Sequence, residues 1–308
     1  MANITQKTVV TVAQVGRVDK VVQALTGRSR AQIRGLVDHG CITINGASCE
    51  SDFEPVVAGD EVAATYSPHQ NYPEKPRAKA NKPFKLIFED NDLLVVEKPA
   101  HMLTVPTPKR ETDTLVHHLQ KYVSVGRKKQ GRVEIVHRLD RGVSGVLVFA
   151  KSPETASALK AQFAAHKPER EYIALVAGKL ATDAGTFDKN LVTDEHTIHR
   201  SVATKPGEGE RAVTHYEVIK RLPGATLVRV RLETGRRNQI RVHFADAGHP
   251  VLGDPRYTPE KAQHPRWRIQ RIALHAATLA FTHPTTNAEV RFEAPWPKEI
   301  KEFMKVNW

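Results

Sequence analysis

The sequence has few cysteines and no long apolar run, and each shortage excludes a class of protein. No segment of its 308 residues approaches the ~20 apolar residues that a membrane-spanning helix needs, so we expect no membrane partner. Cys41 and Cys49 are too few for a disulfide framework or for a zinc site made of cysteines. The first residues lack a basic stretch followed by an apolar one, which predicts no secretory signal and a cytoplasmic location.

Motifs for nucleotides and metals are missing as well. Neither the phosphate loop G-x-x-x-x-G-K-[ST] nor the dinucleotide fingerprint G-x-G-x-x-G occurs. The 15 histidines are scattered, and His117-His118 lacks the i, i+4 spacing of a zinc-binding helix. The residues therefore indicate neither a nucleotide cofactor nor a metal site.

Positive charge is what the sequence has in excess. Its 46 Lys and Arg residues outnumber its 34 Asp and Glu residues, which gives a net charge of +12. Such an excess favours polyanionic partners, because each phosphate that a protein neutralises releases counterions. A basic protein without such a partner is the alternative at this point.

Residues 67–83 divide the chain. They carry four prolines, several polar residues and no apolar periodicity, a composition typical of an extended linker. We therefore expect a small domain over residues 1–66 and a larger one over 84–308.

Two short helices and a few strands are expected in the small domain. Residues 17–24 form a helical pattern that Gly27 ends, and Ser29 is placed to cap a second helix. Asn45-Gly46 predicts a hairpin turn after a short strand, and residues 61–66 are typical of another strand.

The two predicted helices carry most of the positive charge of this domain. Asp19 is the single acid among five basic residues, and this segregation favours contact with phosphates over a merely solvated face. The five are Arg17, Lys20, Arg28, Arg30 and Arg34. The domain resembles the RNA-binding module first known from ribosomal protein S4, in Arg17-Val-Asp-Lys, Ser29-Arg30, Ile42-Thr-Ile-Asn45-Gly46 and Gly59-Asp60.

The larger domain mixes strands and helices without the regular alternation that predicts a parallel doubly wound sheet. We therefore expect an α+β fold, built on a largely antiparallel mixed sheet with flanking helices. The strands are expected over 86–90, 93–97, 146–150, 172–176, 213–219 and 226–232, and the helices over 154–166 and 239–247.

Two clusters in this domain are candidates for chemistry. Asp140 follows His137-Arg138-Leu139 and has an arginine on either side. Neighbouring guanidinium groups would keep its carboxylate ionised as a nucleophile or base, but an aspartate at a turn has an equally plain structural role. The second cluster, residues 232–243, carries three arginines, which suits phosphate or carboxylate binding or a solvated helix end. Tyr172, at the start of a strand, is by itself typical of a core residue.

Together these segments resemble the RluA-type RNA pseudouridine synthases, in which an S4-like domain on the N-terminal side is a usual arrangement. The resemblance rests on Lys98-Pro99, His137-Arg138-Leu139-Asp140, Ser144-Gly145, Tyr172-Ile-Ala-Leu-Val, Thr234-Gly235-Arg236, Gln239-Ile240-Arg241, Gly248-His249-Pro250 and Gly253-Asp254. It implies an enzyme that isomerises uridine to pseudouridine in structured RNA, ribosomal or transfer, without a cofactor or a metal. We also expect a monomer.

The resemblance also assigns roles. Asp140 matches the catalytic aspartate, which attacks C1′ of the sugar or C6 of the base before the uracil rejoins through C5. Arg241 matches its basic partner, and Tyr172 matches the tyrosine that stacks on the base and assists removal of the C5 proton. The residues expected to bind RNA are Arg17, Lys20, Arg28, Arg30, Arg34, His137, Arg138 and Arg236.

Three positions depart from the family's usual pattern: Asn238 replaces a common histidine, Val143 a threonine and His101 a glycine. None has a proposed chemical role. Two other functions compete with this one. A passive RNA-binding or ribosome-assembly protein would not need an intact Asp140, and a glycosidase would need a second carboxylate, which the matched motifs lack.

Overall fold

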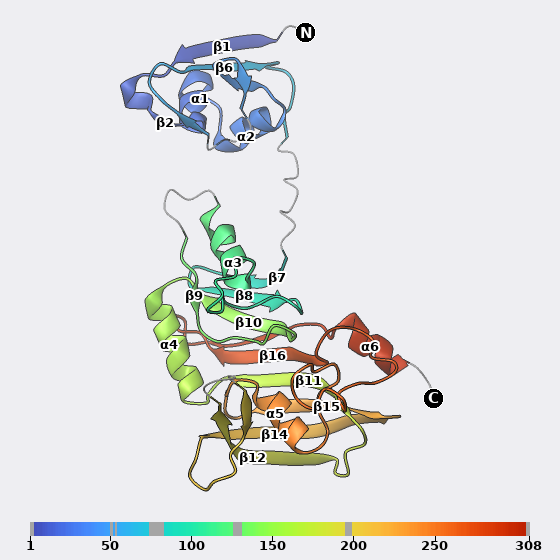
Figure 1. Cartoon of the computed structure of the whole chain (residues 1–308). Helices are drawn as coiled ribbons and strands as arrows, with labels where there is room; N and C mark the ends of the chain where they lie inside the picture. The colour runs from blue at the N-terminus through green and yellow to red at the C-terminus, as the bar shows by residue number, and fades with distance from the viewer. Residues whose placement is uncertain are drawn as a thin grey trace. The chain divides into compact units, whose positions relative to one another are not determined.

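The computed structural model divides into two units (Figure 1), Met1–Lys82 and Pro83–Trp308. It describes residues 3–49, 52, 54–73, 83–125, 131–194 and 199–305. Among these residues, no helix combines the length and the apolar character that a bilayer crossing requires.

The two helices of the first unit lie where the sequence predicts them. Helix α1 (Val18–Thr26) ends at Gly27, whose φ of 68° is left-handed. Helix α2 (Arg30–Asp38) is capped by Ser29, whose hydroxyl accepts from the Gln32 N–H at 3.4 Å while the Gln32 side chain accepts from the Ser29 N–H at 3.0 Å. This reciprocal cap fixes the start of α2.

A four-stranded sheet in the order β1-β6-β3-β4 packs against these helices. Asn45 (φ 52°) and Gly46 (φ 81°) make the predicted turn between β3 and β4. The remaining elements of this unit are β1 (Ile4–Val9), the 3-10 helix η1 (Val12–Gln14), β2 (Gly16–Arg17), β3 (Ile42–Ile44), β4 (Ala47–Ser48), β5 (Pro55–Val56) and β6 (Glu61–Tyr66).

The first unit continues past Tyr66, where the sequence places its end. The Ser67 N–H donates to the Tyr72 hydroxyl at 2.8 Å, and His39 Nε2 lies 3.1 Å from the main-chain oxygen of Pro73. Residues 67–73 therefore pack on α2, and the rest of the predicted linker, residues 74–82, lies outside the described residues.

The second unit is organised round one sheet, with strands in the order β13-β12-β14-β15-β11-β16-β10-β8-β7 and with β9 and β17 attached to β10 and β16. Neighbouring strands are antiparallel except β10 and β16, which run parallel, so the predicted α+β class with a largely antiparallel mixed sheet is confirmed. The strands are β7 (Lys85–Glu89), β8 (Leu93–Lys98), β9 (Glu134–Ile135), β10 (Ser144–Ala150), β11 (Glu169–Ala177), β12 (Ala184–Thr193), β13 (Arg200–Val202), β14 (Glu210–Leu222), β15 (Ala225–Leu232), β16 (Leu274–Thr282) and β17 (Glu289–Glu293). The helices are α3 (Leu115–Ser124), α4 (Pro153–Ala164), α5 (Gln239–Asp246) and α6 (Lys298–Lys305).

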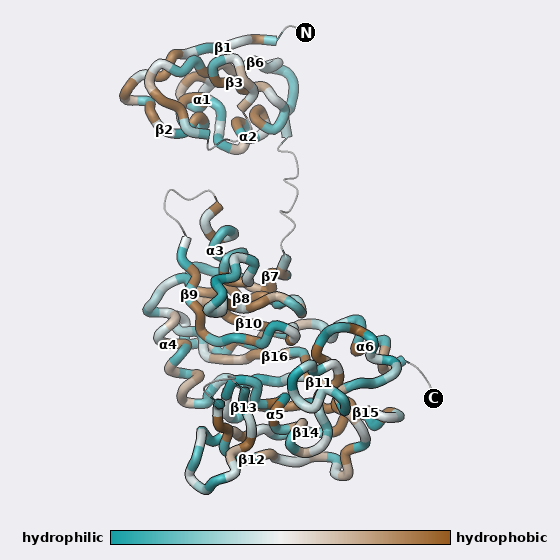
Figure 2. Tube along the Cα trace, in the orientation of Figure 1, coloured by the Kyte–Doolittle hydropathy of each residue, from teal (hydrophilic) through white to brown (hydrophobic). Residues whose placement is uncertain are grey.

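Apolar residues cover both faces of β8 and β10, which appear brown in Figure 2. Because side chains alternate across a strand, one set packs with α3 and the other with α4. The first set is Leu94, Val96, Leu147 and Phe149, and the second is Val95, Val146 and Val148.

Gly145 makes the parallel contact between β10 and β16 possible. It pairs with Ala276, and its φ of 123° lies in the left-handed half of the map. A Cβ atom at this position would lie 2.1 Å from the main-chain oxygen of Ala276. The glycine therefore fixes where the loop before β10 joins the sheet.

A buried polar pair lies at the same junction. Ser144 Oγ is 2.8 Å from His275 Nδ1 and accepts from Arg271 Nη2 at 2.7 Å. Burial lowers the pKa of His275 to about 4. An unfolded chain binds this proton near its ordinary pKa of about 6.5, so the stability that neutral His275 gives is present above about pH 6.5 and is lost as the pH falls towards 4.

We expect the free energy of unfolding of the second unit to fall between about pH 6.5 and about pH 4. His275→Asn keeps an acceptor for Ser144 but does not titrate, so its slope should be smaller by up to one proton, about 1.4 kcal/mol per pH unit. Urea unfolding followed by tryptophan fluorescence measures this, because Trp267, Trp296 and Trp308 all belong to the second unit. Equal slopes for the two proteins would contradict the assignment.

Candidate active site

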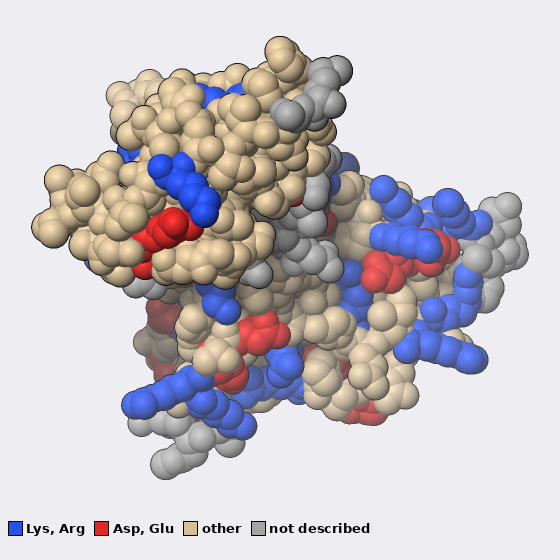
Figure 3. Space-filling view, turned by 90° about the horizontal axis from the view of Figure 1, so that it is seen from above, with Lys and Arg blue, Asp and Glu red and all other residues tan. Residues whose placement is uncertain are grey.

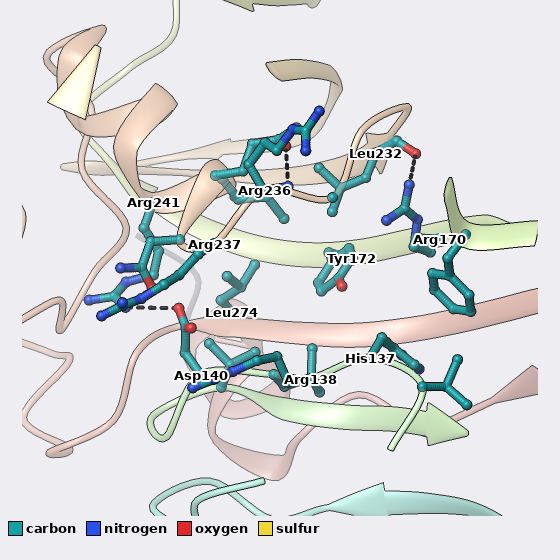
Figure 4. A pocket seen from close by; sticks show the side chains of 18 of the residues that line it. His137, Arg138, Asp140, Arg170, Tyr172, Leu232, Arg236, Arg237, Arg241 and Leu274 are labelled. Carbon is teal, nitrogen blue, oxygen red and sulfur yellow. Dashed lines mark hydrogen bonds and ion pairs between the residues drawn. The ribbon is translucent and has the colours of Figure 1, made fainter. Parts of the chain in front are cut away.

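A pocket of about 550 Å³ in the second unit collects the two clusters that the sequence singles out (Figure 4). Its walls come from the loop before β10, from β11 and from the turn that leads into α5. Asp140 and Arg241, 101 residues apart in the chain, both line it, and so does Tyr172.

Main-chain contacts fix the loop that carries Asp140. The buried hydroxyl of Thr104 donates to the Leu139 carbonyl at 2.8 Å and accepts from the Leu139 N–H at 3.2 Å. The Val143 N–H donates to the Asp140 carbonyl at 3.1 Å and closes the turn. The position of Asp140 is thus set by the backbone, which leaves its carboxylate available for other contacts.

Lys98 supports the same loop from inside the protein. It is fully buried, and its Nζ donates to the Met102 carbonyl at 2.7 Å and to the Arg141 carbonyl at 3.3 Å. Burial lowers the pKa of Lys98 to about 7; the charge of Asp140 opposes this shift, and that of Arg271 adds to it.

Arg241, near the start of α5, holds two carboxylates. Its Nη1 donates to Asp140 Oδ2 at 2.8 Å, while Nε and Nη2 donate to the two oxygens of Asp254 at 2.7 and 2.8 Å. Burial alone would lower the pKa of Arg241, but the hydrogen bonds and charges of the two aspartates outweigh it and raise that pKa. Asp140 Oδ1 accepts no hydrogen bond from the described residues, so one carboxylate oxygen is held and the other is available.

Asn238 completes the surroundings of Arg241. Its Oδ1 accepts from Arg241 Nη1 at 3.1 Å, and its Nδ2 donates to the Tyr257 hydroxyl at 2.9 Å. The Tyr257 ring faces the guanidinium at 4.9 Å. Asn238 has a left-handed φ of 57°, which asparagine tolerates better than most residues, so this departure from the family's pattern fits its place.

Tyr172, on β11, is 8% exposed and lines the pocket. Burial raises the pKa of its hydroxyl; the charge of Arg170 opposes the rise, and that of Asp140 adds to it. The phenol is therefore neutral at neutral pH.

His137 lines the pocket but is tied to the fold. Its Nε2 accepts from the Val148 N–H at 3.2 Å, and its ring stacks on Phe163 with the ring centres 4.6 Å apart. Burial and the charge of Arg170 lower the pKa of His137 to about 3. At neutral pH it offers a phosphate no positive charge, and its predicted contact with RNA stays a prediction.

The two arginines expected to bind RNA in this unit both line the pocket. Arg138 is exposed. Arg236 is partly exposed, and its Nη1 lies 2.7 Å from Glu210 Oε1. Arg237, which is not among the residues predicted to bind RNA, also lines the pocket and makes no ion pair with a described residue.

In the first unit, several of the predicted RNA-binding residues have partners within the fold. Arg17 donates to the buried Asp19 at 3.0 and 2.5 Å, and Arg30 lies 3.5 Å from the same carboxylate. The guanidinium of Arg28 lies 4.3 Å from the centre of the Tyr66 ring. These three side chains therefore support the fold at the same time as they present charge.

Lys20 and Arg30 are the exposed cations of this set, and Arg34 is partly buried. Of the two, Lys20 makes no ion pair with a described residue, whereas Arg30 lies beside Asp19. Many other basic side chains are neutralised locally. Over the face that Figure 3 presents, several Lys and Arg side chains lie next to Asp or Glu. The net charge of the chain is thus a poor guide to where a polyanion binds.

One group of possible metal ligands occurs among the described residues: Asp90, Asp92 and His283. His283 Nε2 lies 2.8 Å from Asp90 Oδ2, and Asp90 Oδ1 accepts from the N–H groups of Asp92 and Leu93. These contacts join the β7–β8 turn to the end of β16, which explains the group without an ion. None of the three residues lines the pocket.

The structural roles of three residues around the site are not predicted from the sequence. Asp254 belongs to a Gly-Asp turn, and nothing in the turn shows that it binds Arg241. Thr104 and Arg170 have no sequence signal, because their importance depends on which main-chain atoms come near them. Lys98 is part of the family resemblance but has no role assigned from the sequence, although a lysine that ends an apolar strand is a signal that could have suggested one.

The RNA pseudouridylate synthase family model matches residues 92–246, and the S4 domain model matches residues 16–62. A ribosomal large subunit pseudouridine synthase D of Zymomonas mobilis is 34% identical to this chain, over 98% of the chain and 97% of its own length. An uncharacterized RNA pseudouridine synthase of Bacillus subtilis is 35% identical, over 94% of the chain and 93% of its own length.

Two solved human structures share the fold. RNA pseudouridylate synthase domain containing 4 has a TM-score of 0.58 at 21% identity, and it covers 70% of this chain and 89% of its own. RNA pseudouridylate synthase domain containing 1 has a TM-score of 0.56 at 24% identity and covers 70% and 84%. The site, the family matches and the relatives agree: this chain belongs to the RluA-type RNA pseudouridine synthases, enzymes that isomerise uridine in RNA, and it carries an S4 domain.

Proposed function

We propose that this enzyme converts uridine to pseudouridine in ribosomal RNA of the large subunit, with Asp140 as its nucleophile. The observation that carries the proposal is the 2.8 Å contact between Arg241 and Asp140 Oδ2 in a pocket of about 550 Å³. Relatives named for the large ribosomal subunit support this RNA, and transfer RNA is the alternative.

The proposed reaction moves one bond from nitrogen to carbon. A uridine leaves its stack and enters the pocket. Asp140 Oδ1 attacks C1′ of the ribose or C6 of the base, while Arg241 holds Oδ2 and keeps the carboxylate ionised. The C1′–N1 bond breaks, the uracil turns, and a C1′–C5 bond forms. Loss of the C5 proton and release of Asp140 complete the exchange.

For Tyr172 we infer a stacking role. Its ring lines the pocket, and its raised pKa keeps the hydroxyl protonated. A protonated phenol is a poor acceptor for the C5 proton, so we expect Tyr172 to assist by holding the base in place.

The S4 domain would bind RNA through the basic face of α1 and α2, with the body reading the target loop. Lys20→Glu should weaken RNA binding several-fold and lower the slope of log K against log salt by about one or more. Lys301→Glu on α6 makes the same charge change at an exposed lysine with no described ion pair, so it serves as the matched control. Fluorescence anisotropy with labelled RNA at several salt concentrations measures both, and equal losses would contradict a specific role for this face.

The oligomeric state, the location and the division of labour between the two domains also belong to the proposal. We propose that the protein acts as a monomer in the cytoplasm. The match to the S4 domain model and the division into two units support an RNA-binding domain followed by a catalytic domain. A passive RNA-binding or assembly role is the competing reading.

Release of tritium from RNA labelled with 5-³H-uridine tests the activity. The RNA should come from cells that lack this gene, and it should be separated into large-subunit ribosomal and transfer RNA. We expect release from the ribosomal fraction, followed by mapping of the modified uridine. Release from transfer RNA alone would show that the substrate is transfer RNA and not ribosomal RNA. Tight binding without release from either fraction would support the passive role.

A further inference from the structure

Arg170 is a buried cation in the pocket that the reaction scheme above does not use. It lies on β11 two residues before Tyr172, so both side chains leave the same face of the strand. Arg170 is 7% exposed and lines the pocket. In Figure 4, Tyr172 lies between Asp140 on one side and Arg170 on the other.

Arg170 differs from the other buried arginines in lacking a carboxylate. Among the described residues, four arginines are buried to this degree: Arg170, Arg200, Arg241 and Arg271. The other three each pair with an aspartate or glutamate. Arg170 makes no ion pair with a described residue. A buried charge without a partner of opposite sign is strongly destabilising, and an anionic ligand in the pocket would supply the missing partner.

The hydrogen bonds of Arg170 leave part of the guanidinium unused. Nη2 donates to the main-chain oxygens of Glu233 at 2.9 Å and Leu232 at 3.4 Å. No described residue accepts a hydrogen bond from Nε or from Nη1, and the guanidinium lies 5.6 Å from the centre of the Phe163 ring. Two main-chain carbonyls thus orient the group without neutralising it.

Gly235 makes room for the unused side of this guanidinium. A Cβ atom on Gly235 would lie 2.3 Å from Arg170 Nη1, so any other residue would displace the group. Gly235 itself lines the pocket. The turn before α5 therefore keeps Nη1 beside the space that a ligand would fill.

We propose that Arg170 binds a carbonyl oxygen of the uracil ring and stabilises the negative charge that the ring gains during the reaction. The inference rests on the proposed function. When Asp140 Oδ1 bonds to C1′ and the C1′–N1 bond breaks, the electron pair spreads over N1 and O2. When it bonds to C6 instead, the pair spreads over C5 and O4. In both cases a uracil oxygen gains negative charge and can act as the anionic partner of Arg170. A fixed hydrogen-bond donor at this oxygen lowers the activation free energy of the step.

The test uses a short RNA that contains the mapped uridine, with oxygen or sulfur at C2 or C4 of that base. Sulfur is a weak acceptor, so one of the two thio substrates should slow the wild type about tenfold. Arg170→Gln should lose about 100-fold in turnover of the oxygen substrate while RNA affinity stays within about threefold. We call the ratio of the turnover of the oxygen substrate to that of the slower thio substrate the thio effect. In Arg170→Gln this ratio should fall close to one. Arg170→Lys should retain more turnover than Arg170→Gln. The C5-linked nucleoside is measured by chromatography after digestion.

Two controls separate this role from a structural one. Arg229→Gln, at a partly exposed arginine of β15 that does not line the pocket, should show the same slowing by sulfur as the wild type. Arg170→Gln should unfold in urea at the wild-type midpoint or above it, because it removes an unpaired buried charge. A lower midpoint with an unchanged thio effect would overturn the inference, as would wild-type turnover in the variant. A wild type inactive on the oxygen substrate would overturn the proposed function and this inference with it.

Discussion

Replacing Asp140 by asparagine is expected to abolish release of the C5 proton, a loss on the order of 10⁴-fold or more, with RNA affinity nearly unchanged. The amide has nearly the shape of the carboxylate, and it can still accept from Arg241 Nη1, but it is no nucleophile. The loop should also keep its place, because Thr104 and Val143 hold it through main-chain atoms.

Tritium release by the variant and the wild type, measured on the same RNA, decides this prediction. Asp188→Asn is the matched control, since it makes the same change at an exposed aspartate of β12 that pairs with Arg211. The control should react at the wild-type rate. If Asp140→Asn kept even a few per cent of that rate, Asp140 would not be the nucleophile.

Arg241→Met is expected to have two separate effects. It removes the cation beside Asp140, which should lower turnover steeply. It also leaves Asp254, whose side chain has no exposed surface, as a buried charge without its partner. Breaking a buried pair in this way costs about 3–5 kcal/mol of folding free energy.

A second substitution separates the two effects. In the double variant Arg241→Met with Asp254→Asn, neither member of the buried pair carries a charge, so most of the lost stability should return. Turnover should not return, because Asp140 still lacks its cation. Urea unfolding by tryptophan fluorescence gives the stability, and tritium release gives the activity. Recovery of both in the double variant would show that Arg241 acts only through the fold.

The sequence predicts elements well where a segment carries its own signal. Residues 146–150 are all apolar because both faces of β10 are covered, and Ser29 caps α2 through atoms only three residues away. Strand β1 gives no such signal, since most of its residues are exposed. Strand β16 is missed because His275 and two threonines interrupt its apolar run.

The residues of the site also differ in how clearly the sequence signals their roles. Asp140, Tyr172 and Arg241 are found through motifs, which lie in single short stretches of sequence. The carboxylate of Asp254 and the charge of Arg170 look ordinary until the fold decides what surrounds them. Sequence motifs therefore identify the reactive groups more easily than they identify the residues that position those groups or balance their charge.

The place of β16 in the sheet has a consequence for biosynthesis. This strand, which comes late in the chain, lies between β10, next to the loop of Asp140, and β11, which carries Tyr172. Until residues 274–276 have been synthesised, no other strand among the described residues joins these two halves of the sheet. The S4 domain can thus fold on the ribosome before β16 has been made, whereas the catalytic pocket closes only after this strand has joined β10 to β11. We therefore expect the growing chain to gain its proposed RNA-binding domain before it gains its catalytic pocket.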